Sequence, residues 1–550
     1  MKILQIIFIP AFLFISAITS NAQNHTKIPS EKPALIIGIV IDQMRYDYIY
    51  RFWEKYGDGG LKMMVQGGTF CKNASYNFLI NETAVGHATI STGALPSHHG
   101  IISNNWYVSL QDKIINCVED DKVNTVVGSY ESGRYSPRKL LASTIGDELK
   151  LANNFRTKVI GIALDNYAAI LSAGHTADYA FWFDSETGNW VTSSYYVDSL
   201  PDWVVEFNEK RLANVYLERT WETLLPLAEY TESVSDTNKL ETGIKGRYVF
   251  PYDLKKISSP RRNETDYDII KYTPFGNALT KDLAIAAIMN EELGKDEYTD
   301  ILTIGFSVNE YIGKVFGSNS VEMEDALLRL DRNLEHFFDF IDEYVGKERT
   351  LIYLTADHGL AYNPAYLEGH RIPSGEFNPN AALSLLGSYL NIIYGRGDWI
   401  KYYYAQQLYL NHELIEDARI PLEEFQEKVV LFLLQFEGVS NAVSAHTLQT
   451  TNFSDGIFRN IQNGYHQKRS GDVIINLAPG WTEKSYNNSS YHSSYIGDNH
   501  VPLLWYGWKI SRATINRSVN LVDIVPTLAY FLDISRPNAA MGEIILELVE

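Results

Sequence analysis

The sequence predicts an α/β protein built as a doubly wound sandwich, with helices on both faces of a mostly parallel sheet. Short apolar runs of seven to nine residues recur along the chain, and such runs are typical of strands that are buried on both faces. Amphipathic helical stretches separate most of these runs, as in folds that alternate strands with helices. Two regions interrupt this alternation and are predicted to decorate the main domain.

Five apolar runs are expected to form buried parallel strands, at residues 34–42, 158–164, 301–307, 351–357 and 501–507. Helices are expected between them, at residues 136–152, 277–292 and 320–345. The first helix is opened by Ser136-Pro137, an N-cap followed by proline at the first helical position. The third places apolar residues at helical spacing, which predicts one buried face.

The two interrupting regions differ in composition. Residues 180–270 are rich in tyrosine, tryptophan, proline and charge, which predicts a loop-rich decoration. Residues 375–480 contain a strand-like run at 388–394, a helical stretch at 421–436 and a strand-like run at 439–445. This second region is expected to form a small inserted α+β cap.

The N-terminus has the pattern of a secretory signal peptide. Met1-Lys2 precedes an apolar run at 3–18, and small residues lead to Ala22. Cleavage after Ala22 leaves residues 23–550 as the main domain and predicts a periplasmic or secreted protein. The run is shorter than the roughly 18 residues of a membrane span, and no later run reaches that length. The alternative is a buried N-terminal strand or an anchor helix.

Charge and cysteine content limit the possible functions. The chain has 67 acidic and 47 basic side chains, a net charge of -20, which disfavours nucleic-acid binding. An anionic small-molecule substrate would therefore need a metal ion or a local cationic cluster. Cys71 and Cys117 are too few for a disulfide framework, and the sequence does not show whether they pair. The chain is expected to act as a monomer.

Polar residues at predicted strand ends are the first candidates for a site. Asp42 ends one strand, and Asp357-His358 ends another; both sets suit a metal, although a lone strand-end Asp is more often a helix N-cap. Thr83 precedes a predicted helix, where a hydroxyl can act as a nucleophile or simply as an N-cap. The loop that contains Asn104 can bind an oxyanion. His87, one helical turn after Thr83, is expected in the core or behind the site.

Beyond these residues, the chain resembles the PafA-type alkaline phosphatases, relatives of the nucleotide pyrophosphatase/phosphodiesterases. The resemblance runs nearly end to end after the signal peptide, because many separate segments occur in the family's order. These segments are IVIDQMRYDYIYRFWEKYGDGG, TAVGHATISTG, GIISNNWY, ILSAGH with FWFD, TPFGN, NSVEMED with LRLDR, TADHG, GYHQKRSGD and HVPLLWYGW.

The resemblance implies a phosphohydrolase with an α/β sandwich, a cap and two zinc ions. It implies that Thr83 attacks phosphorus to give a phospho-threonine, which water then hydrolyses. By position, Asn104 binds the oxyanion. The ligands of the zinc on the nucleophile side are Asp42, Thr83, Asp357 and His358, so this half of the site is complete.

The other zinc site departs from the family pattern. Glu310 stands where the family has Asp, and Lys314 stands where it has His. A lysine ammonium has no lone pair to offer a metal. The third ligand, His492, is present.

The phosphate clamp of the family departs as well. The family places a lysine and an arginine before the ILSAGH-like block, and here Asp165 and Tyr167 occupy those positions. Loss of two positive charges and gain of a negative one disfavour a phosphomonoester and favour a diester, whose phosphoryl group carries one charge fewer.

Three hypotheses remain from the sequence. The first is a phosphohydrolase with one zinc ion or an altered pair, in which Lys314 supplies part of the missing charge. The second is an ordinary two-zinc phosphatase completed by Glu310, His492 and a further ligand. The third is a catalytically impaired or inactive family member that binds its ligand without turnover.

Overall fold

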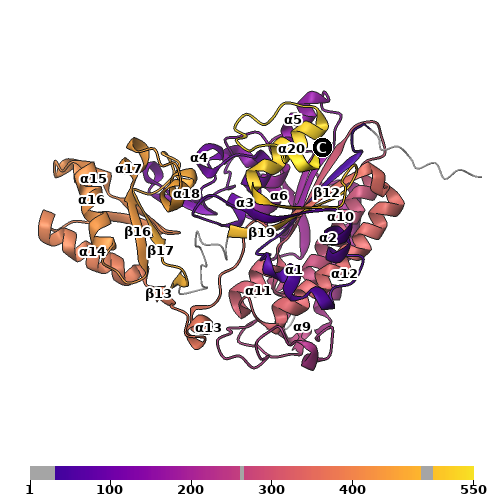
Figure 1. Ribbon diagram of the computed structural model, residues 1–550, viewed down its shortest axis with the longest axis horizontal. Helices are drawn as coiled ribbons and strands as arrows, with labels where there is room; N and C mark the ends of the chain where they lie inside the picture. The colour runs from indigo at the N-terminus through magenta and orange to yellow at the C-terminus, as the bar shows by residue number, and fades with distance from the viewer. Residues whose placement is uncertain (1–30, 260–264, 485–498, 550) are drawn as a thin grey trace, which may run out of the picture.

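A computed structural model describes residues 31–259, 265–484 and 499–549 of the chain (Figure 1). The predicted signal peptide and His492 lie outside these residues. The described chain is an α/β sandwich around a ten-stranded sheet of order β20-β2-β19-β12-β1-β11-β6-β7-β8-β5. The predicted fold class is confirmed, and a second, smaller sheet lies beside the main domain.

The centre of the main sheet is parallel and consists of four of the predicted strands. These are β12 (Thr350–Thr355), β1 (Leu35–Ile41), β11 (Asp300–Phe306) and β6 (Val159–Ala163). Every residue of these strands is buried, as expected for runs covered by helices on both faces.

The fifth predicted strand is present but runs in the opposite direction. Strand β19 (His500–Gly507) pairs antiparallel with β12 on one side and with β2 (Thr69–Ser75) on the other. The prediction of a parallel strand was therefore wrong. An apolar run indicates burial on both faces, and burial does not depend on strand direction.

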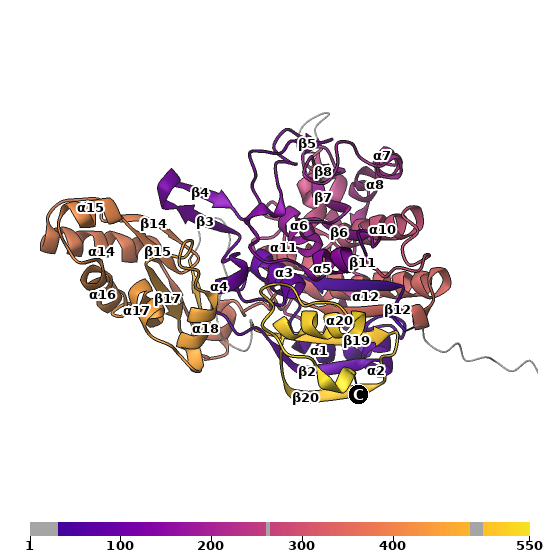
Figure 2. The ribbon, with the colours of Figure 1, turned by 90° about the horizontal axis from the view of Figure 1, so that it is seen from above.

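Two groups of helices cover the sheet (Figure 2). Helices α6 and α10 both pack on β6 and β11, so they cover opposite faces. The group around α6 comprises α3 (Thr83–Thr92), α5 (Ile145–Ala152), α6 (Asn166–Ala173) and α20 (Ile524–Leu532). The group around α10 comprises α2 (Leu61–Gly67), α10 (Pro274–Asn290), α11 (Val308–Phe316) and α12 (Val321–Tyr344).

Two predicted elements were wrong in local detail. The helix expected at 136–152 begins only at Ile145, because Thr144 and Asp147 form a capping box there. Ser136 caps a separate short turn, Pro137–Lys139. The strand expected at 388–394 is the end of helix α14 (Pro379–Tyr394), which buries leucines at helical spacing. The aromatic and β-branched residues of this segment obscured that spacing in the sequence.

The region predicted as a cap contains a four-stranded sheet of order β14-β15-β17-β16 with its own apolar core. Its strands are β14 (Ile400–Tyr404), β15 (Gln407–Leu410), β16 (Val439–Ser444) and β17 (Val473–Leu477), and helix α16 (Leu422–Leu433) packs on them. Strand β14 meets β3 (Asn105–Val108) of the main domain, where Asn105 Nδ2 donates to Tyr404 Oη at 3.3 Å.

The region predicted as loop-rich decoration is partly regular. Its first strands, β7 (Tyr179–Asp184) and β8 (Asn189–Ser193), extend the main sheet. Cys71 and Cys117 are buried and unpaired. Across the described ranges, no helix combines the length and apolarity that a bilayer crossing requires.

Candidate active site

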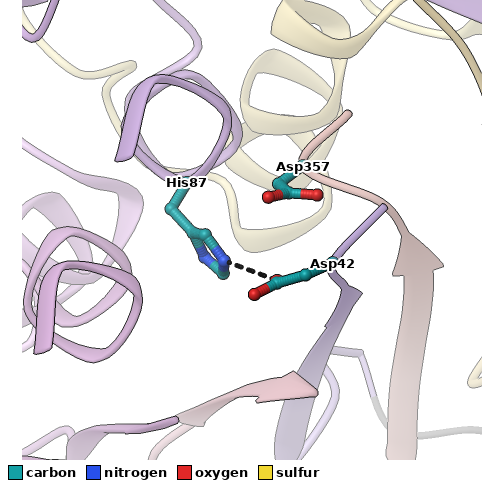
Figure 3. A group of neighbouring side chains, drawn as sticks. All are labelled: Asp42, His87 and Asp357. Atoms are coloured by element: carbon teal, nitrogen blue, oxygen red, sulfur yellow. Dashed lines mark hydrogen bonds and ion pairs between the residues drawn. The ribbon is translucent and has the colours of Figure 1, made fainter. Parts of the chain in front are cut away.

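The predicted site residues meet at the carboxyl end of the central parallel strands. Asp42 directly follows β1, and Asp357 comes two residues after the neighbouring strand β12. Thr83 is the first residue of α3, and all three side chains are fully buried. Figure 3 shows Asp42, Asp357 and His87, which projects from α3 toward them. The topology thus assembles residues more than 270 positions apart in the sequence.

The tautomer of His358 is fixed by a backbone contact. Its Nδ1 lies 2.7 Å from the carbonyl oxygen of Gly359, which can only accept, so Nδ1 carries the hydrogen. Its Nε2 lies 3.3 Å from Asp357 Oδ2, so either a proton or a metal ion on Nε2 can join the two groups.

Two carboxylate oxygens beside this histidine have no hydrogen-bond partner among the described residues: Asp42 Oδ2 and Asp357 Oδ2. The other Asp357 oxygen accepts from the backbone N–H groups of Gln43 at 3.0 Å and His358 at 2.7 Å, which fixes the carboxylate. Two aspartates, a histidine nitrogen and a nearby hydroxyl form a donor set that suits zinc. The residues therefore fit the nucleophile-side ion.

Negative charge accumulates in this buried space. Burial first, and then the charges of Asp357, Glu310 and Asp165, raise the pKa of Asp42 well above its usual value. Burial and the charge of Glu310 likewise raise the pKa of Asp357, although His358 and two backbone N–H groups oppose the shift. A bound cation would relieve this repulsion.

The nucleophile candidate and the oxyanion candidate are held by neighbouring polar groups. Thr83 Oγ1 donates to Glu310 Oε2 at 3.1 Å. Asn104 Oδ1 accepts from the backbone N–H of Ala84 at 2.9 Å, so the N–H groups of Asn104 Nδ2 are those available to a ligand oxygen. The Glu82 carboxylate accepts from the backbone N–H of Asn104 and from the Ser103 hydroxyl, which fixes this loop.

The two departures from the family pattern lie next to each other. Glu310 Oε1 accepts from the Lys314 ammonium at 2.5 Å, one helical turn along α11. Asp165 precedes α6 and accepts a hydrogen bond from the Tyr311 hydroxyl through Oδ1, while its Oδ2 has no partner among the described residues. Oxygens of Asp42, Asp165 and Glu310 lie within 4.8 Å of one another.

Tyr167 is half-buried beside the same carboxylates. Burial first, and then the charges of Asp165 and Glu310, raise the pKa of its hydroxyl well above the usual value. Tyr167 is therefore neutral, and it brings no positive charge to the position where the family has arginine.

Two further residues border the site. His87 Nε2 lies 3.4 Å from Asp42 Oδ1, and its Nδ1 lies 2.8 Å from Ser172 Oγ. Ligand atoms of His87, Asp42 and Asp357 lie within 4.8 Å of one another, so His87 is itself a candidate metal ligand. Its spacing of four residues from Thr83 was the available signal. Tyr311, adjacent to Glu310, carried no signal, because nothing in the sequence connects it with Asp165.

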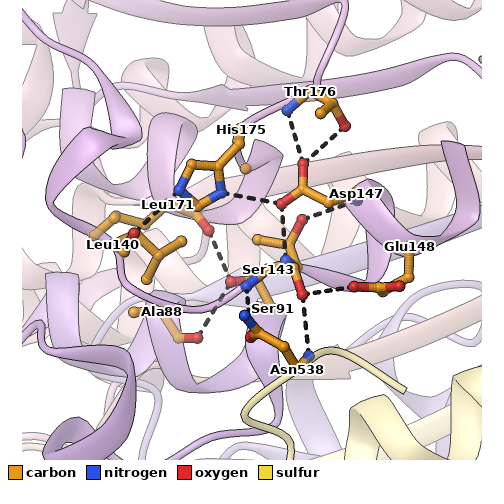
Figure 4. Close-up of polar contacts among 12 residues, drawn as sticks. Ala88, Ser91, Leu140, Ser143, Asp147, Glu148, Leu171, His175, Thr176 and Asn538 are labelled. Carbon is orange, nitrogen blue, oxygen red and sulfur yellow. Dashed lines mark hydrogen bonds and ion pairs between the residues drawn. The ribbon is translucent and has the colours of Figure 1, made fainter. Parts of the chain in front are cut away.

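The helices that carry Thr83 and Asp165 are tied to each other and to α5 (Figure 4). Ser91 Oγ on α3 donates to the carbonyl oxygen of Leu171 on α6 at 2.7 Å. Just beyond α6, His175 Nδ1 lies 3.1 Å from Asp147 Oδ2, and its Nε2 lies 3.0 Å from the carbonyl oxygen of Leu140. Both partners can only accept, so this geometry suits a doubly protonated imidazolium.

The ion pair predicts a pH-dependent contribution to stability. Burial lowers the pKa of His175, but the hydrogen bond and the charge of Asp147 outweigh this effect and raise it. Burial raises the pKa of Asp147, but the hydrogen bond to His175 and other contacts outweigh this effect and lower it. A raised histidine pKa stabilises the fold below the unfolded value of about 6.5 and loses this effect as pH rises through the folded value. His175→Asn should therefore cost about 1–3 kcal/mol near pH 6 and less near pH 9. Urea unfolding of both proteins measures the difference; a cost that does not depend on pH would contradict the imidazolium.

Comparison with known proteins shows the family of the chain. Residues 36–500 match the family described as type I phosphodiesterase / nucleotide pyrophosphatase. The chain belongs to this family, whose members are phosphoric ester hydrolases. Within it, the chain is similar over nearly its whole length to the PafA-type alkaline phosphatases, as its motifs predicted.

Individual relatives support the assignment. The chain is 37% identical to alkaline phosphatase PafA of Elizabethkingia meningoseptica over 534 residues, covering 96% of each protein. It is 38% identical to a protein named calcium-transporting ATPase of Myroides odoratus over 526 residues, covering 94% of this chain and 95% of that protein. The crystal structure of wild-type PafA matches with a TM-score of 0.89, covering 94% of this chain and 99% of that one.

Proposed function

We propose that this protein is an exported phosphoester hydrolase that uses Thr83 as nucleophile and one zinc ion, and that it prefers phosphodiesters to phosphomonoesters. The observation that carries the proposal is His358 Nε2, 3.3 Å from a buried oxygen of Asp357 that has no hydrogen-bond partner among the described residues. Asp42, Asp357 and His358 would hold the ion beside Thr83. When bound, it supplies the positive charge that favours the alkoxide form of the Thr83 hydroxyl.

The protein's own groups account for the remaining steps. Thr83 lies at the positive end of α3, which stabilises negative charge on its oxygen, and Glu310 Oε2 holds its hydroxyl hydrogen. Attack forms a bond from Thr83 Oγ1 to phosphorus and breaks the bond to the leaving oxygen. The N–H groups of Asn104 Nδ2 bind a non-bridging oxygen, and Lys314 supplies positive charge to the leaving group. Water then hydrolyses the phospho-threonine.

The charge of the site favours a substrate with a single negative charge. Asp165 is buried and has one unpartnered oxygen, and Tyr167 is neutral, so neither replaces the cationic clamp of the family. Two like charges about 4 Å apart cost roughly 4 kcal/mol at an effective dielectric constant near 20. A dianionic monoester meets more of this repulsion than a monoanionic diester does.

The preference can be measured with two nitrophenyl substrates. We expect kcat/KM for bis-nitrophenyl phosphate to exceed that for nitrophenyl phosphate by about tenfold or more, since tenfold corresponds to about 1.4 kcal/mol. Asp165→Asn should shift the ratio toward the monoester. Asp331→Asn is the control, because Asp331 is a buried carboxylate that binds the backbone of Gly57 and Leu61. A preference of the unaltered enzyme for the monoester would refute the role given to Asp165.

A second candidate function is ligand binding without turnover. The Glu310 carboxylate favours this function, because both of its oxygens already have partners. Lys314 donates to Oε1 at 2.5 Å, and Thr83 donates to Oε2 at 3.1 Å. A protein that binds zinc and phosphate but turns over neither nitrophenyl substrate would support it.

The proposal of export rests on the N-terminal segment. N-terminal sequencing of the mature protein should show that it begins at Gln23.

A further inference from the structure

Among the described residues, the Glu310–Lys314 pair at the position of the family's second ion does not fit a divalent cation; His492 lies outside these residues. Glu310 offers two oxygens, but Oε1 binds the Lys314 ammonium at 2.5 Å and Oε2 accepts from Thr83 at 3.1 Å. Lys314 has no lone pair with which to ligate a metal. An ammonium in contact with the carboxylate that would bind a metal also repels that metal.

Lys314 is itself a well-held cation. Burial alone would lower the pKa of its ammonium, but the charge and hydrogen bond of Glu310, together with the charge of Asp165, raise it to about 12. The side chain is 30% exposed, whereas that of Glu310 is 6% exposed. The partly exposed ammonium is therefore held against a buried carboxylate.

Asp165 belongs to the same assembly. Its Oδ1 accepts from the Tyr311 hydroxyl, and the Lys314 ammonium lies 5.4 Å from the centre of the Tyr311 ring. The ammonium of Lys271 lies 5.4 Å from the same ring. Burial first, and also the charge of Glu310, raise the pKa of Asp165 above its usual value, while the charges of Lys271 and Lys314 oppose this shift. Tyr311 thus donates to the Asp165 carboxylate through its hydroxyl and lies near both lysine ammonium groups through its ring.

We propose that Lys314 is a tethered cation that takes the place of the second metal ion, and that Asp165 and Glu310 are the carboxylates that hold it there. The two departures from the family pattern are then one compensating change. The histidine that would ligate a second metal ion is not restored, and the Lys314 ammonium lies against the Glu310 carboxylate instead. Asp165 is a positioning residue for Lys314. This inference deepens the one-ion site proposed above.

The proposal predicts that removing the lysine charge creates a need for an external cation. In Lys314→Met, oxygens of Asp42, Asp165 and Glu310 remain within 4.8 Å of one another, an all-oxygen set that suits Mn²⁺. Protein loaded with one zinc ion per chain is titrated with Mn²⁺, and free Mn²⁺ is measured by electron paramagnetic resonance. The zinc keeps its own site, because zinc binds more tightly than manganese.

We expect no stoichiometric Mn²⁺ binding by the unaltered protein and one Mn²⁺ per chain in Lys314→Met. Adding Asp165→Asn to that variant should weaken Mn²⁺ binding at least about tenfold. Lys150→Met is the matched control, because the buried Lys150 on α5 forms an ion pair with the half-buried Asp178 at 2.7 Å. It should gain no Mn²⁺.

Two results would overturn the proposal. One is stoichiometric Mn²⁺ binding by the unaltered protein; the other is a folded Lys314→Met that binds none. Near-ultraviolet circular dichroism checks folding, and Lys314→Gln replaces the methionine variant if that one does not fold. The test does not use turnover, so an inactive protein that still gains Mn²⁺ would refute the proposed hydrolase and leave the tethered cation standing.

Discussion

Thr83→Ala should abolish phosphoester hydrolysis, with a loss in kcat of at least about 10³-fold. Without Oγ1, Thr83 cannot form the bond to phosphorus. Removing a nucleophile that works together with neighbouring catalytic groups causes losses of this size or larger. Steady-state rates with bis-nitrophenyl phosphate measure the effect. Thr83 is fully buried, so circular dichroism should accompany the rates.

Two further variants separate chemistry from packing. Thr83→Ser keeps a hydroxyl at the N-terminus of α3 and should retain measurable turnover. Thr92→Ala is the matched control on the same helix, because the buried Thr92 hydroxyl donates only to the carbonyl oxygen of Ala88 at 2.6 Å. It should leave kcat within about threefold. Turnover by Thr83→Ala at a rate near that of the unaltered enzyme would refute the assigned nucleophile.

Asp357→Asn should remove both zinc and activity. The variant keeps the shape of the side chain but loses the charge that faces His358 Nε2, so zinc affinity should fall at least about 100-fold. Turnover should fall with it at limiting zinc. Competition with a chromophoric chelator measures the affinity directly.

Asp331→Asn serves as the control for this variant as well, since it alters a buried carboxylate that contacts only the N-terminal part of α2 and the preceding loop. Its zinc affinity should match that of the unaltered protein. If the Asp357→Asn protein binds zinc as tightly as the unaltered protein, the ion lies elsewhere.

The centre of the fold was predictable from the sequence because strands buried on both faces consist of continuous apolar residues. Strands β1, β6, β11 and β12 lie where those runs indicated. The direction of β19 and the helical nature of residues 388–394 were not predictable from composition, since both depend on which neighbours the segment packs against. The tertiary setting overrode local propensity in α14.

The residues of the candidate site were chosen from the sequence, but their contacts were not predictable from it. Asp42, Thr83, Asp357 and His358 follow from strand ends and family motifs, and the structure brings them to one edge of the sheet. The tautomer of His358 and the bond between Tyr311 and Asp165 are three-dimensional facts. Without them, Asp165 and Lys314 look like two separate defects of a phosphatase site.

The zinc content of the mature protein tests the central claim most directly. The protein is saturated with zinc, freed of loosely bound metal and measured by elemental analysis. The account predicts one zinc ion per chain, lost in Asp357→Asn. Two ions per chain would contradict the replacement of the second ion by Lys314, and none would contradict the proposed hydrolase.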